Sequence, residues 1–486
     1  MYSKLTNRGY IVNKKDLTFN QVQQIKKDLV VSPFVPKDFP QPPSYPIFLE
    51  SPNKYYLPRY YGIEMFGKPT EILLKDGNPI NLEFNGKLRE VQEIAKKHYM
   101  EYIYDDYGGG IICLPCGYGK SILALNILNQ IKQKTLIIVH KEFLANQWVD
   151  RINSHLPGAK IGKIQGKVLD INNKDICIAM LQTLTLKEFP KDTFSSFGLV
   201  ILDEVHHLSS EVFSRALLKV NVKYTLGLTA TPERADGLTH VFLKFLGPIV
   251  YQHKRDKSNS FNLIVKHIKY ESGNENENNK YNTVELTNMG KVCSSRMINN
   301  VTQYSKRNEL LINTLHYLGS NKERNIILLS DRREHLNYLY TNLDKERYDI
   351  GYYVGGMKQQ LLDKTASECQ IILSTYSMAA EALDIPKLNC LILASPKVSV
   401  EQSVGRILRK QHNIAPLVID IEDHFSIFKN QYKKRTKFYK TNNYLIDTIE
   451  YNDENCFDNT YLDRNPIIKT ITTKKSNKTK INVIKL

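Results

Sequence analysis

The sequence predicts an α/β protein made of two successive units, each built around a parallel sheet. Short apolar runs without polar alternation recur along the chain, and amphipathic helical stretches separate them. A strand that is apolar on both faces is typical of a parallel sheet with helices on both sides. The alternation stops over a polar stretch near residues 251–300 and then resumes, which divides the pattern into two units.

The first unit, 85–250, is expected to contain five buried strands, with helices between them at 121–133 and 141–156. The strands are IICL (111–114), TLIIV (135–139), DICIAM (175–180), LVILD (199–203) and YTLGLT (224–229). The second unit, 301–440, repeats the pattern with NIILLS (325–330), YDIGYYV (348–354), CQIILST (369–375), CLILAS (390–395) and PLVIDI (416–421). Residues 251–300 are polar, which favours a linker or insertion.

The two ends of the chain differ from the units in composition. Residues 1–84 are predicted to be an accessory region, in which the prolines between 33 and 46 favour extended chain. The aromatic-rich stretch 53–67 that follows is expected to pack against the first unit. Residues 441–486 are predicted to be a basic tail, and the lysine-rich stretch QYKKRTKFYK (431–440) is likewise predicted to be solvated.

Composition and charge narrow the class of protein. Hydrophobic residues make up 42% of the chain, a proportion that is normal for a soluble globular protein. Lysine and arginine number 67 against 50 acidic residues, a formal net charge of +17 that favours a polyanionic partner. The seven cysteines are odd in number and mostly isolated, which indicates a reducing compartment. No signal peptide and no apolar run of ~18 residues is present, so we expect a soluble, intracellular protein without a membrane partner.

A phosphate-binding loop is predicted between the first expected strand and the helix that follows it. The sequence LPCGYGKS comprises Leu114, Pro115, Cys116, Gly117, Tyr118, Gly119, Lys120 and Ser121. Its glycines let backbone N–H groups face a phosphate, and the helix N-terminus adds its dipole. Lys120 is expected to reach the β- and γ-phosphates of ATP, and Ser121 to hold Mg²⁺. Leu114 stands where the first glycine of the usual pattern would be. Cys113 and Cys116 form a C-x-x-C, but no second pair at ligand spacing supports a zinc or redox site.

Two acidic residues follow another expected strand in LVILDEVHH (199–207). We expect Asp203 to hold Mg²⁺ through water, and Glu204 to orient and deprotonate the attacking water. The neighbouring His206 and His207 lack an apparent third ligand, which disfavours a histidine metal site.

The sequence QSVGRILR (402–409) is expected to complete the site from the second unit. Arginines at the γ-phosphate accelerate phosphoryl transfer by stabilising the developing negative charge. Arg406 and Arg409 are three residues apart, so they are predicted to share one helix face, and Gln402 precedes them. ATP would then lie between the two units.

Together these motifs resemble helicase superfamily two, the DExH-box DNA and RNA helicases. Pro115–Ser121 has that superfamily's P-x-G-x-G-K-S form, and Asp203–His206 is a D-E-x-H box. Further matches, in order along the chain, are LREVQ (88–92), IIVHKEFLANQW (137–148), MLQTL (180–184), GLTATPERADG (227–237), NIILLSDRREH (325–335), STYSMAAEALDIP (374–386) and QSVGRILR (402–409). In the fifth motif Ala382 replaces the glycine often found there.

The resemblance implies two RecA-like domains and roles for further residues. Gln92 would read adenine. His206, Thr229 and Thr231 would couple the D-E-x-H box to the nucleic-acid path. Gln182, Thr183 and Thr375 would contact the nucleic-acid backbone, without reading base sequence.

Within the superfamily the residues TATPERADG and LREVQ resemble the XPB-like branch and its relatives in large DNA viruses, including the poxviral transcript-release helicase. This implies an ATP- and Mg²⁺-dependent helicase or translocase acting on DNA, with RNA as the alternative, in viral transcription, replication or repair. A viral protein of this kind would work in the host cytoplasm beside the transcription or replication machinery, and would be packaged in the virion. The sequence is compatible with a monomer and leaves the oligomeric state open.

Three alternative functions make different predictions about these motifs. A P-loop kinase or small NTPase predicts no arginine motif in a second unit, and a binding module with a decayed ATPase predicts the loss of residues such as Lys120 or Glu204. A translocase or transcript-release factor that does not separate strands fits the motifs as well as a helicase does.

Overall fold

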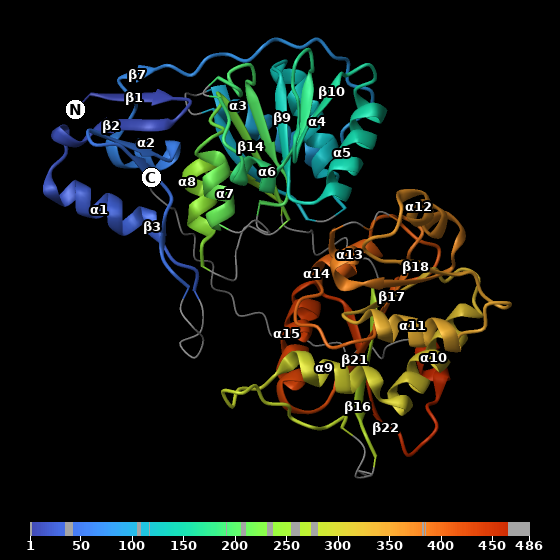
Figure 1. Ribbon diagram of the computed structural model, residues 1–486. Coiled ribbons are helices and arrows are strands. Elements are labelled where there is room, and N and C mark those ends of the chain that lie inside the picture. Colours follow the sequence, from blue (N-terminus) through green and yellow to red (C-terminus); the bar gives the residue numbers. More distant parts are fainter. Residues whose placement is uncertain are drawn as a thin grey trace, which may run out of the picture. The chain divides into compact units, whose positions relative to one another are not determined.

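The computed structural model describes residues 2–34, 42–104, 108–115, 117–190, 192–205, 210–230, 237–253, 263–273, 280–381, 383 and 385–464. The chain divides into two compact units, Met1–Arg255 and Asp256–Leu486 (Figure 1). Each unit contains a sheet of mainly parallel strands with helices packed on it, which confirms the predicted α/β fold class. Within the described ranges, no helix combines the length and the apolar character that crossing a membrane requires.

The main sheet of the first unit runs in the order β11-β10-β12-β9-β13-β14-β8-β15, and the described pairs are parallel except β10 with β11. Its strands are β8 (Gly109–Cys113), β9 (Thr135–Val139), β10 (Ile161–Gln165), β11 (Val168–Asp170), β12 (Ile176–Met180), β13 (Leu199–Leu202), β14 (Tyr224–Thr229) and β15 (Ile249–Gln252). The helices are α3 (Glu90–Tyr102), α4 (Lys120–Ile131), α5 (Glu142–His155), α6 (Leu181–Leu186), α7 (Ser210–Leu217) and α8 (Thr239–Leu246).

Both faces of this sheet are buried, as the apolar runs predict. Successive residues of one strand enter different clusters: Ile111 packs with residues of α7 and α8, whereas Ile112 packs with residues of α3, α4 and α5. The alternation follows from the pleat, which directs neighbouring side chains to opposite faces. Each expected strand of the first unit is therefore present within a residue or two of its predicted bounds.

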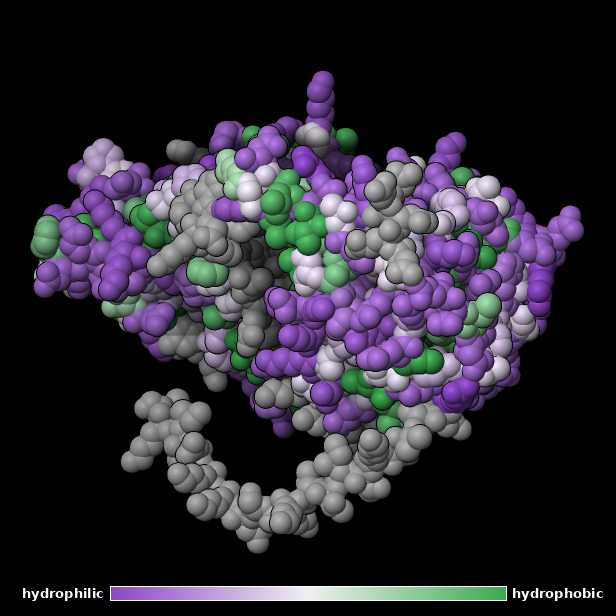
Figure 2. Space-filling model, turned by 90° about the horizontal axis from the view of Figure 1, so that it is seen from below, coloured by the Kyte–Doolittle hydropathy of each residue, from purple (hydrophilic) through white to green (hydrophobic). Residues whose placement is uncertain are grey.

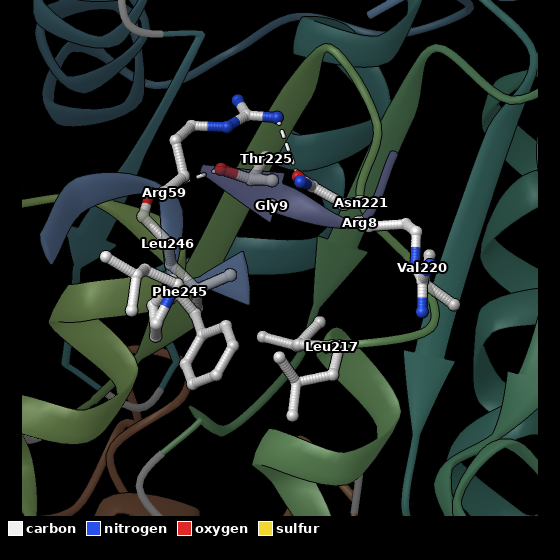
Figure 3. Close-up of a pocket in the computed structure, with 12 residues that line it drawn as sticks. Arg8, Gly9, Arg59, Leu217, Val220, Asn221, Thr225, Phe245 and Leu246 are labelled. Carbon is white, nitrogen blue, oxygen red and sulfur yellow. Dashed lines mark hydrogen bonds between the residues drawn. The ribbon is translucent and has the colours of Figure 1, made fainter. Parts of the chain in front are cut away.

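The N-terminal region forms a smaller sheet in the order β5-β6-β2-β1-β7, packed against the rest of the first unit. Its elements are β1 (Ser3–Thr6), β2 (Gly9–Asn13), α1 (Phe19–Leu29), β5 (Leu49–Glu50), β6 (Lys54–Leu57), α2 (Arg59–Phe66) and β7 (Glu71–Ile72), with β3 (Val30–Val31) and β4 (Tyr45–Pro46) as a separate pair. At the contact, the buried Arg59 donates to the Lys223 carbonyl at 2.9 Å. It also donates to the Asn221 side chain at 2.8 Å (Figure 3). The stretch 53–67 thus packs against the first unit, as expected.

The second unit contains a parallel sheet in the order β18-β19-β17-β20-β21-β16-β22. Its strands are β16 (Ile264–Glu271), β17 (Ile326–Ser330), β18 (Ile350–Tyr353), β19 (Ile371–Thr375), β20 (Cys390–Leu393), β21 (Leu417–Asp423) and β22 (Leu445–Asn452). The helices are α9 (Ser294–Gln303), α10 (Ser305–Gly319), α11 (Arg333–Asn342), α12 (Gln359–Glu368), α13 (Tyr376–Glu381), α14 (Glu401–Arg406) and α15 (Ser426–Thr441).

This sheet includes strands from the two segments that the sequence was expected to use as a linker and as a tail. Strand β16 lies within the expected linker 251–300, and β22 lies within the expected tail 441–486. The two strands pair with each other, and their charged side chains form ion pairs across that pairing: Lys266 with Asp447 at 2.7 Å and Lys269 with Glu450 at 2.8 Å. Cross-strand charge pairs stabilise polar strands. The lack of an apolar run in these two segments therefore did not mean that they form loops.

The lysine-rich stretch 431–440 is also not a solvated tail, because it belongs to helix α15. Arg435 and Tyr439 of this helix are buried, and both bind the buried carboxylate of Asp420 in β21. A buried arginine is stable only with such a charged, hydrogen-bonded partner. The five basic residues of this stretch are visible in the sequence. The sequence does not show that Asp420 of β21 lies beside them in the fold.

Candidate active site

Three adjacent strands of the first unit end where the predicted catalytic motifs begin. Strands β13, β14 and β8 lie side by side and parallel, so their carboxyl ends meet at one edge of the sheet. Cys113 at the end of β8 pairs in register with Thr229 at the end of β14. The phosphate loop follows β8, and Asp203 follows β13. This edge of an open parallel sheet is where such folds bind ligands.

The phosphate loop has the backbone geometry that its glycines permit. Gly117 and Gly119 have positive φ values of 87° and 72°, and Gly119 caps the N-terminus of α4. A Cβ atom at Gly119 would lie 2.5 Å from the side-chain nitrogen of Gln92, so a larger residue there meets both backbone strain and a clash. Leu114 anchors the start of the loop, because its N–H donates to the Thr229 carbonyl at 3.0 Å. Cys116 lies outside the described residues.

Gln92 holds this loop from the neighbouring helix α3. Its side-chain amide donates to the Gly119 carbonyl at 2.9 Å and accepts from the Arg89 backbone N–H at 2.7 Å. The Arg89 guanidinium in turn donates to the Gly117 carbonyl at 3.1 Å. Gln92 is buried, with 3% of its surface exposed. A loop-positioning contact is therefore visible for Gln92, and adenine recognition stays a prediction.

Lys120 and Glu204, predicted from separate motifs, meet in this structure. The Lys120 Nζ lies 3.1 Å from a Glu204 carboxylate oxygen. Glu204 has a φ of 51°, a left-handed conformation that is uncommon for residues with a Cβ atom. Backbone strain of this kind often persists at functional sites, where the surroundings hold the residue in place.

Asp203 is a buried carboxylate whose second oxygen is left for a ligand. Its Oδ2 accepts a hydrogen bond from the Trp148 indole N–H at 3.0 Å, whereas its buried Oδ1 has no hydrogen-bond partner among the described residues. Burial raises the pKa of Asp203, and the neighbouring Glu204 raises it further, while Lys120 opposes the shift. A carboxylate oxygen without a partner among the described residues fits the oxygen ligands that Mg²⁺ prefers.

Arg151 is a residue of this site that the sequence interpretation missed. It lies on α5, and its guanidinium donates to the Ser121 Oγ at 2.6 Å. Burial lowers the pKa of Arg151, and Asp203 is the largest opposing influence. Trp148 and Arg151 are three residues apart on α5, so they share the helix face that reaches the site. That spacing, with Trp148 at the end of the motif IIVHKEFLANQW and Arg151 just after it, is the signal that could have identified both residues.

The second unit carries the arginine motif at the end of a short helix. Helix α14 ends at Arg406, and Arg409 lies in the turn that follows, so the two arginines do not share one helix face. Ile407 ends the helix because its backbone has left helical geometry, with a ψ of 1°. The Arg406 Nε donates to the Ala379 carbonyl of α13 at 2.7 Å. Gln402 is partly buried within α14.

The predicted nucleic-acid and coupling residues occupy the ends of other elements. Gln182 is exposed on α6 and donates to the His140 carbonyl at 2.8 Å, and the Thr183 hydroxyl accepts from the Gly166 N–H at 3.0 Å. Thr375 ends β19 in the second unit, with its hydroxyl 3.2 Å from that of Ser377. Thr229 is fully buried at the end of β14. His206, Thr231 and Ala382 lie outside the described residues.

Comparison with known proteins identifies families for both units. Residues 85–234 match the family described as "Type III restriction enzyme, res subunit", and residues 306–411 match "Helicase conserved C-terminal domain". The chain is 35% identical to "Putative ATP-dependent RNA helicase L396" of Acanthamoeba polyphaga mimivirus, over 91% of this chain and 86% of that protein. It is 28% identical to "Putative ATP-dependent RNA helicase QP509L" of African swine fever virus, over 75% and 73% of the two chains.

A solved structure shares the two-domain fold at low sequence identity. The S. cerevisiae protein Dbp5, solved bound to RNA and ADP BeF3, aligns with 76% of this chain and 90% of its own, with a TM-score of 0.52 and 12% identity. The similarity shows a common fold. The RecA-like arrangement expected for both units is therefore confirmed.

Proposed function

This chain belongs to the superfamily two helicases, among relatives from large DNA viruses, and we propose that it couples ATP hydrolysis to movement along DNA and to its unwinding. The observation that carries the proposal is the convergence of Lys120, Asp203 and Glu204 at one edge of a parallel sheet. A second α/β unit carries the motif with Arg406 and Arg409.

The geometry supports a division of roles among the residues of the first unit. Ser121 and Asp203 would hold Mg²⁺, which when bound draws negative charge from the phosphate oxygens. Lys120 would bind the terminal phosphates, as the backbone of the phosphate loop cradles them. Glu204 would orient the attacking water and accept its proton.

The Lys120–Glu204 ion pair suggests how ATP binding brings Glu204 into its catalytic role. The two side chains lie 3.1 Å apart, so each is a partner of the other. Phosphate oxygens would attract Lys120 away from Glu204, since they carry more negative charge. Glu204 would then be released as a base only when ATP is present, which links the start of hydrolysis to substrate binding.

The second unit would contribute to the same reaction. We propose that Arg406 and Arg409 approach the γ-phosphate when ATP is bound, and that they withdraw after hydrolysis removes that phosphate. Movement of one unit against the other would then advance the nucleic acid, as in switches held by a terminal phosphate. Gln182, Thr183 and Thr375 would hold the backbone of the strand, so the motor would act on any base sequence.

A second candidate substrate and a second candidate activity follow from specific observations. The viral relatives carry names that describe RNA helicases, so RNA is the second candidate substrate. The second candidate activity is movement on duplex DNA, or transcript release, without strand separation. The motifs are the same for this activity and for unwinding.

One set of assays separates these candidates. ATP hydrolysis is measured with single-stranded DNA, duplex DNA and RNA as separate activators, and strand separation is measured on a duplex with a single-stranded extension. We expect single-stranded DNA to give the largest stimulation and the duplex to be separated. Stimulation by RNA alone would show that the motor acts on RNA. Stimulation by duplex DNA without strand separation would identify a translocase. No stimulation by any of the three would contradict the proposal.

A further inference from the structure

Helix α15 of the second unit presents a row of lysines that no predicted motif accounts for. Among its residues Ser426–Thr441 are five lysines and no acid. Lys433, Lys434, Lys437 and Lys440 are exposed, and Lys429 is partly exposed. The face of the molecule shown in Figure 2 is mostly hydrophilic, with hydrophobic side chains in small patches only.

The opposite face of α15 fixes the helix firmly to the sheet. Arg435 binds both carboxylate oxygens of Asp420 through Nε at 3.1 and 2.9 Å, and its Nη2 lies 2.8 Å from Oδ1. Tyr439 donates to the same carboxylate at 2.8 Å. The ring of Tyr432 stacks on His267 of β16, with 3.7 Å between ring centres. Because these contacts fix the rotation of the helix, the lysines are held on its outer surface.

The acids of the described ranges do not neutralise this row. Within the described part of the chain, none of the five lysines forms an ion pair. The acids of the strands packed nearby already have other partners: Asp420 binds Arg435, Asp423 binds Arg307, and Glu422 binds His267. The two acids of β22 with basic partners, Asp447 and Glu450, bind lysines of β16. Among the residues that the structure describes, the positive charge of the row is therefore not paired with an acid.

The spacing of the lysines works against helix stability. Lys429, Lys433 and Lys437 follow one another at i, i+4, and Lys437 and Lys440 at i, i+3. Like charges at these separations repel each other on the helix surface. A surface helix that needed only solubility would mix acids with its lysines, so this arrangement indicates a ligand that neutralises all of them.

We propose that the α15 lysine row, Lys429, Lys433, Lys434, Lys437 and Lys440, binds the phosphate backbone of the nucleic acid on which the motor acts. Lys429 and Lys440 are eleven residues apart, about 17 Å along a helix, a length over which one strand of duplex DNA presents about five phosphates. The row would add a contact in the second unit to that expected from Thr375. It deepens the proposed function and rests on it, because it assumes a nucleic-acid substrate.

The test neutralises three lysines that no catalytic or loop contact uses. The triple variant Lys433→Gln, Lys437→Gln, Lys440→Gln keeps residues of similar helix propensity. The control variant Lys306→Gln, Lys345→Gln, Lys364→Gln removes the same charge elsewhere on the second unit, where Lys306 and Lys364 already pair with Glu309 and Glu368. Binding to a labelled 20-base-pair duplex is measured by fluorescence anisotropy over a series of NaCl concentrations.

Each lost phosphate contact lowers the slope of log affinity against log salt by about one. We expect the magnitude of this slope to be smaller by about two to three in the triple variant than in the unmodified protein. We also expect the triple variant to bind DNA more weakly at low salt. The control should lose less than one, and ATP hydrolysis without nucleic acid should be unchanged in both. Equal slopes in the two variants would overturn the proposal. Failure of the unmodified protein to bind duplex DNA, single-stranded DNA or RNA would refute the proposed function itself, a separate result.

Discussion

Replacing Trp148 with phenylalanine tests whether α5 positions the carboxylate that we assign to Mg²⁺. Trp148 is fully buried, and its indole N–H is the only hydrogen-bond donor to the Asp203 carboxylate among the described residues. Phenylalanine retains most of the ring but cannot donate. The change therefore removes one hydrogen bond from a buried carboxylate with little loss of packing.

The size of the effect follows from the charge of the acceptor. A hydrogen bond to a charged group contributes about 1.5–3 kcal/mol, which corresponds to a factor of about 10 to 150. Loss of a partner that orients a metal-binding side chain has a similar effect, about 10- to 100-fold in metal affinity. We therefore expect Trp148→Phe to need about 10 to 100 times more Mg²⁺ for half-maximal ATP hydrolysis.

The same change predicts a shift in pH dependence. Burial already raises the pKa of Asp203, and the Trp148 hydrogen bond opposes that rise. Without this bond the pKa rises further, so the carboxyl takes up its proton at a higher pH. Because a protonated carboxyl holds Mg²⁺ poorly, activity should be lost earlier as the pH falls, and high Mg²⁺ should restore it in part.

The assay is a Mg²⁺ titration of ATP hydrolysis at several pH values, with Tyr99→Phe as the control. Tyr99 donates a buried hydrogen bond to the Thr225 carbonyl at 2.8 Å in the same unit, away from Asp203. This control should lower thermal stability without changing the Mg²⁺ requirement. Trp148 is the only tryptophan of the chain, so its fluorescence in the unmodified protein gives a second measure of Mg²⁺ and ATP binding. The reasoning is refuted if Trp148→Phe and the unmodified protein need the same Mg²⁺ concentration.

Three further outcomes are expected. Glu204→Gln should retain ATP binding, measured with a fluorescent analogue, and lose hydrolysis because its base is gone; near-normal turnover would remove Glu204 from that role. Arg409→Ala should lower nucleic-acid-stimulated hydrolysis at least ~100-fold, and unchanged activity would argue against a site shared by both units. Burial lowers the pKa of His335 to about 3, so its protonation favours unfolding, and stability falls by up to about 1.4 kcal/mol per pH unit as the pH drops from about 6.5 toward 3. His335→Gln should show a smaller loss in denaturant unfolding over that range, and parallel losses would contradict the buried neutral histidine.

The first-unit site could be predicted largely from sequence, because its motifs are local. The phosphate loop and the Asp203–Glu204 pair each follow a buried strand, and parallel strands bring their carboxyl ends to one edge. The meeting of Lys120 and Glu204 therefore follows once β8 and β13 lie in the same parallel sheet. The position of Arg409 after the end of α14 could not be predicted in this way. Where a helix ends depends on the backbone of single residues such as Ile407.

Contacts between separate elements escaped the sequence interpretation. Trp148 and Arg151 reach the site only because α5 packs against the sheet with that face inward, and nothing in their local sequence names Asp203 or Ser121 as a partner. The strands β16 and β22 were missed for a similar reason, since Lys266 and Lys269 make each strand look polar until Asp447 and Glu450 pair with them.

The sequence by itself determined the two α/β units, the positions of most strands along the chain and the motifs to which we assign ATP binding and hydrolysis. These depend on apolar periodicity and on short motifs, in which neighbouring residues act together. Only the tertiary structure decided which charges are buried and which face solvent. In α15 it turned Arg435 inward to Asp420 and left the lysines outside, because a buried charge requires a partner that lies nearby in space but not always in sequence.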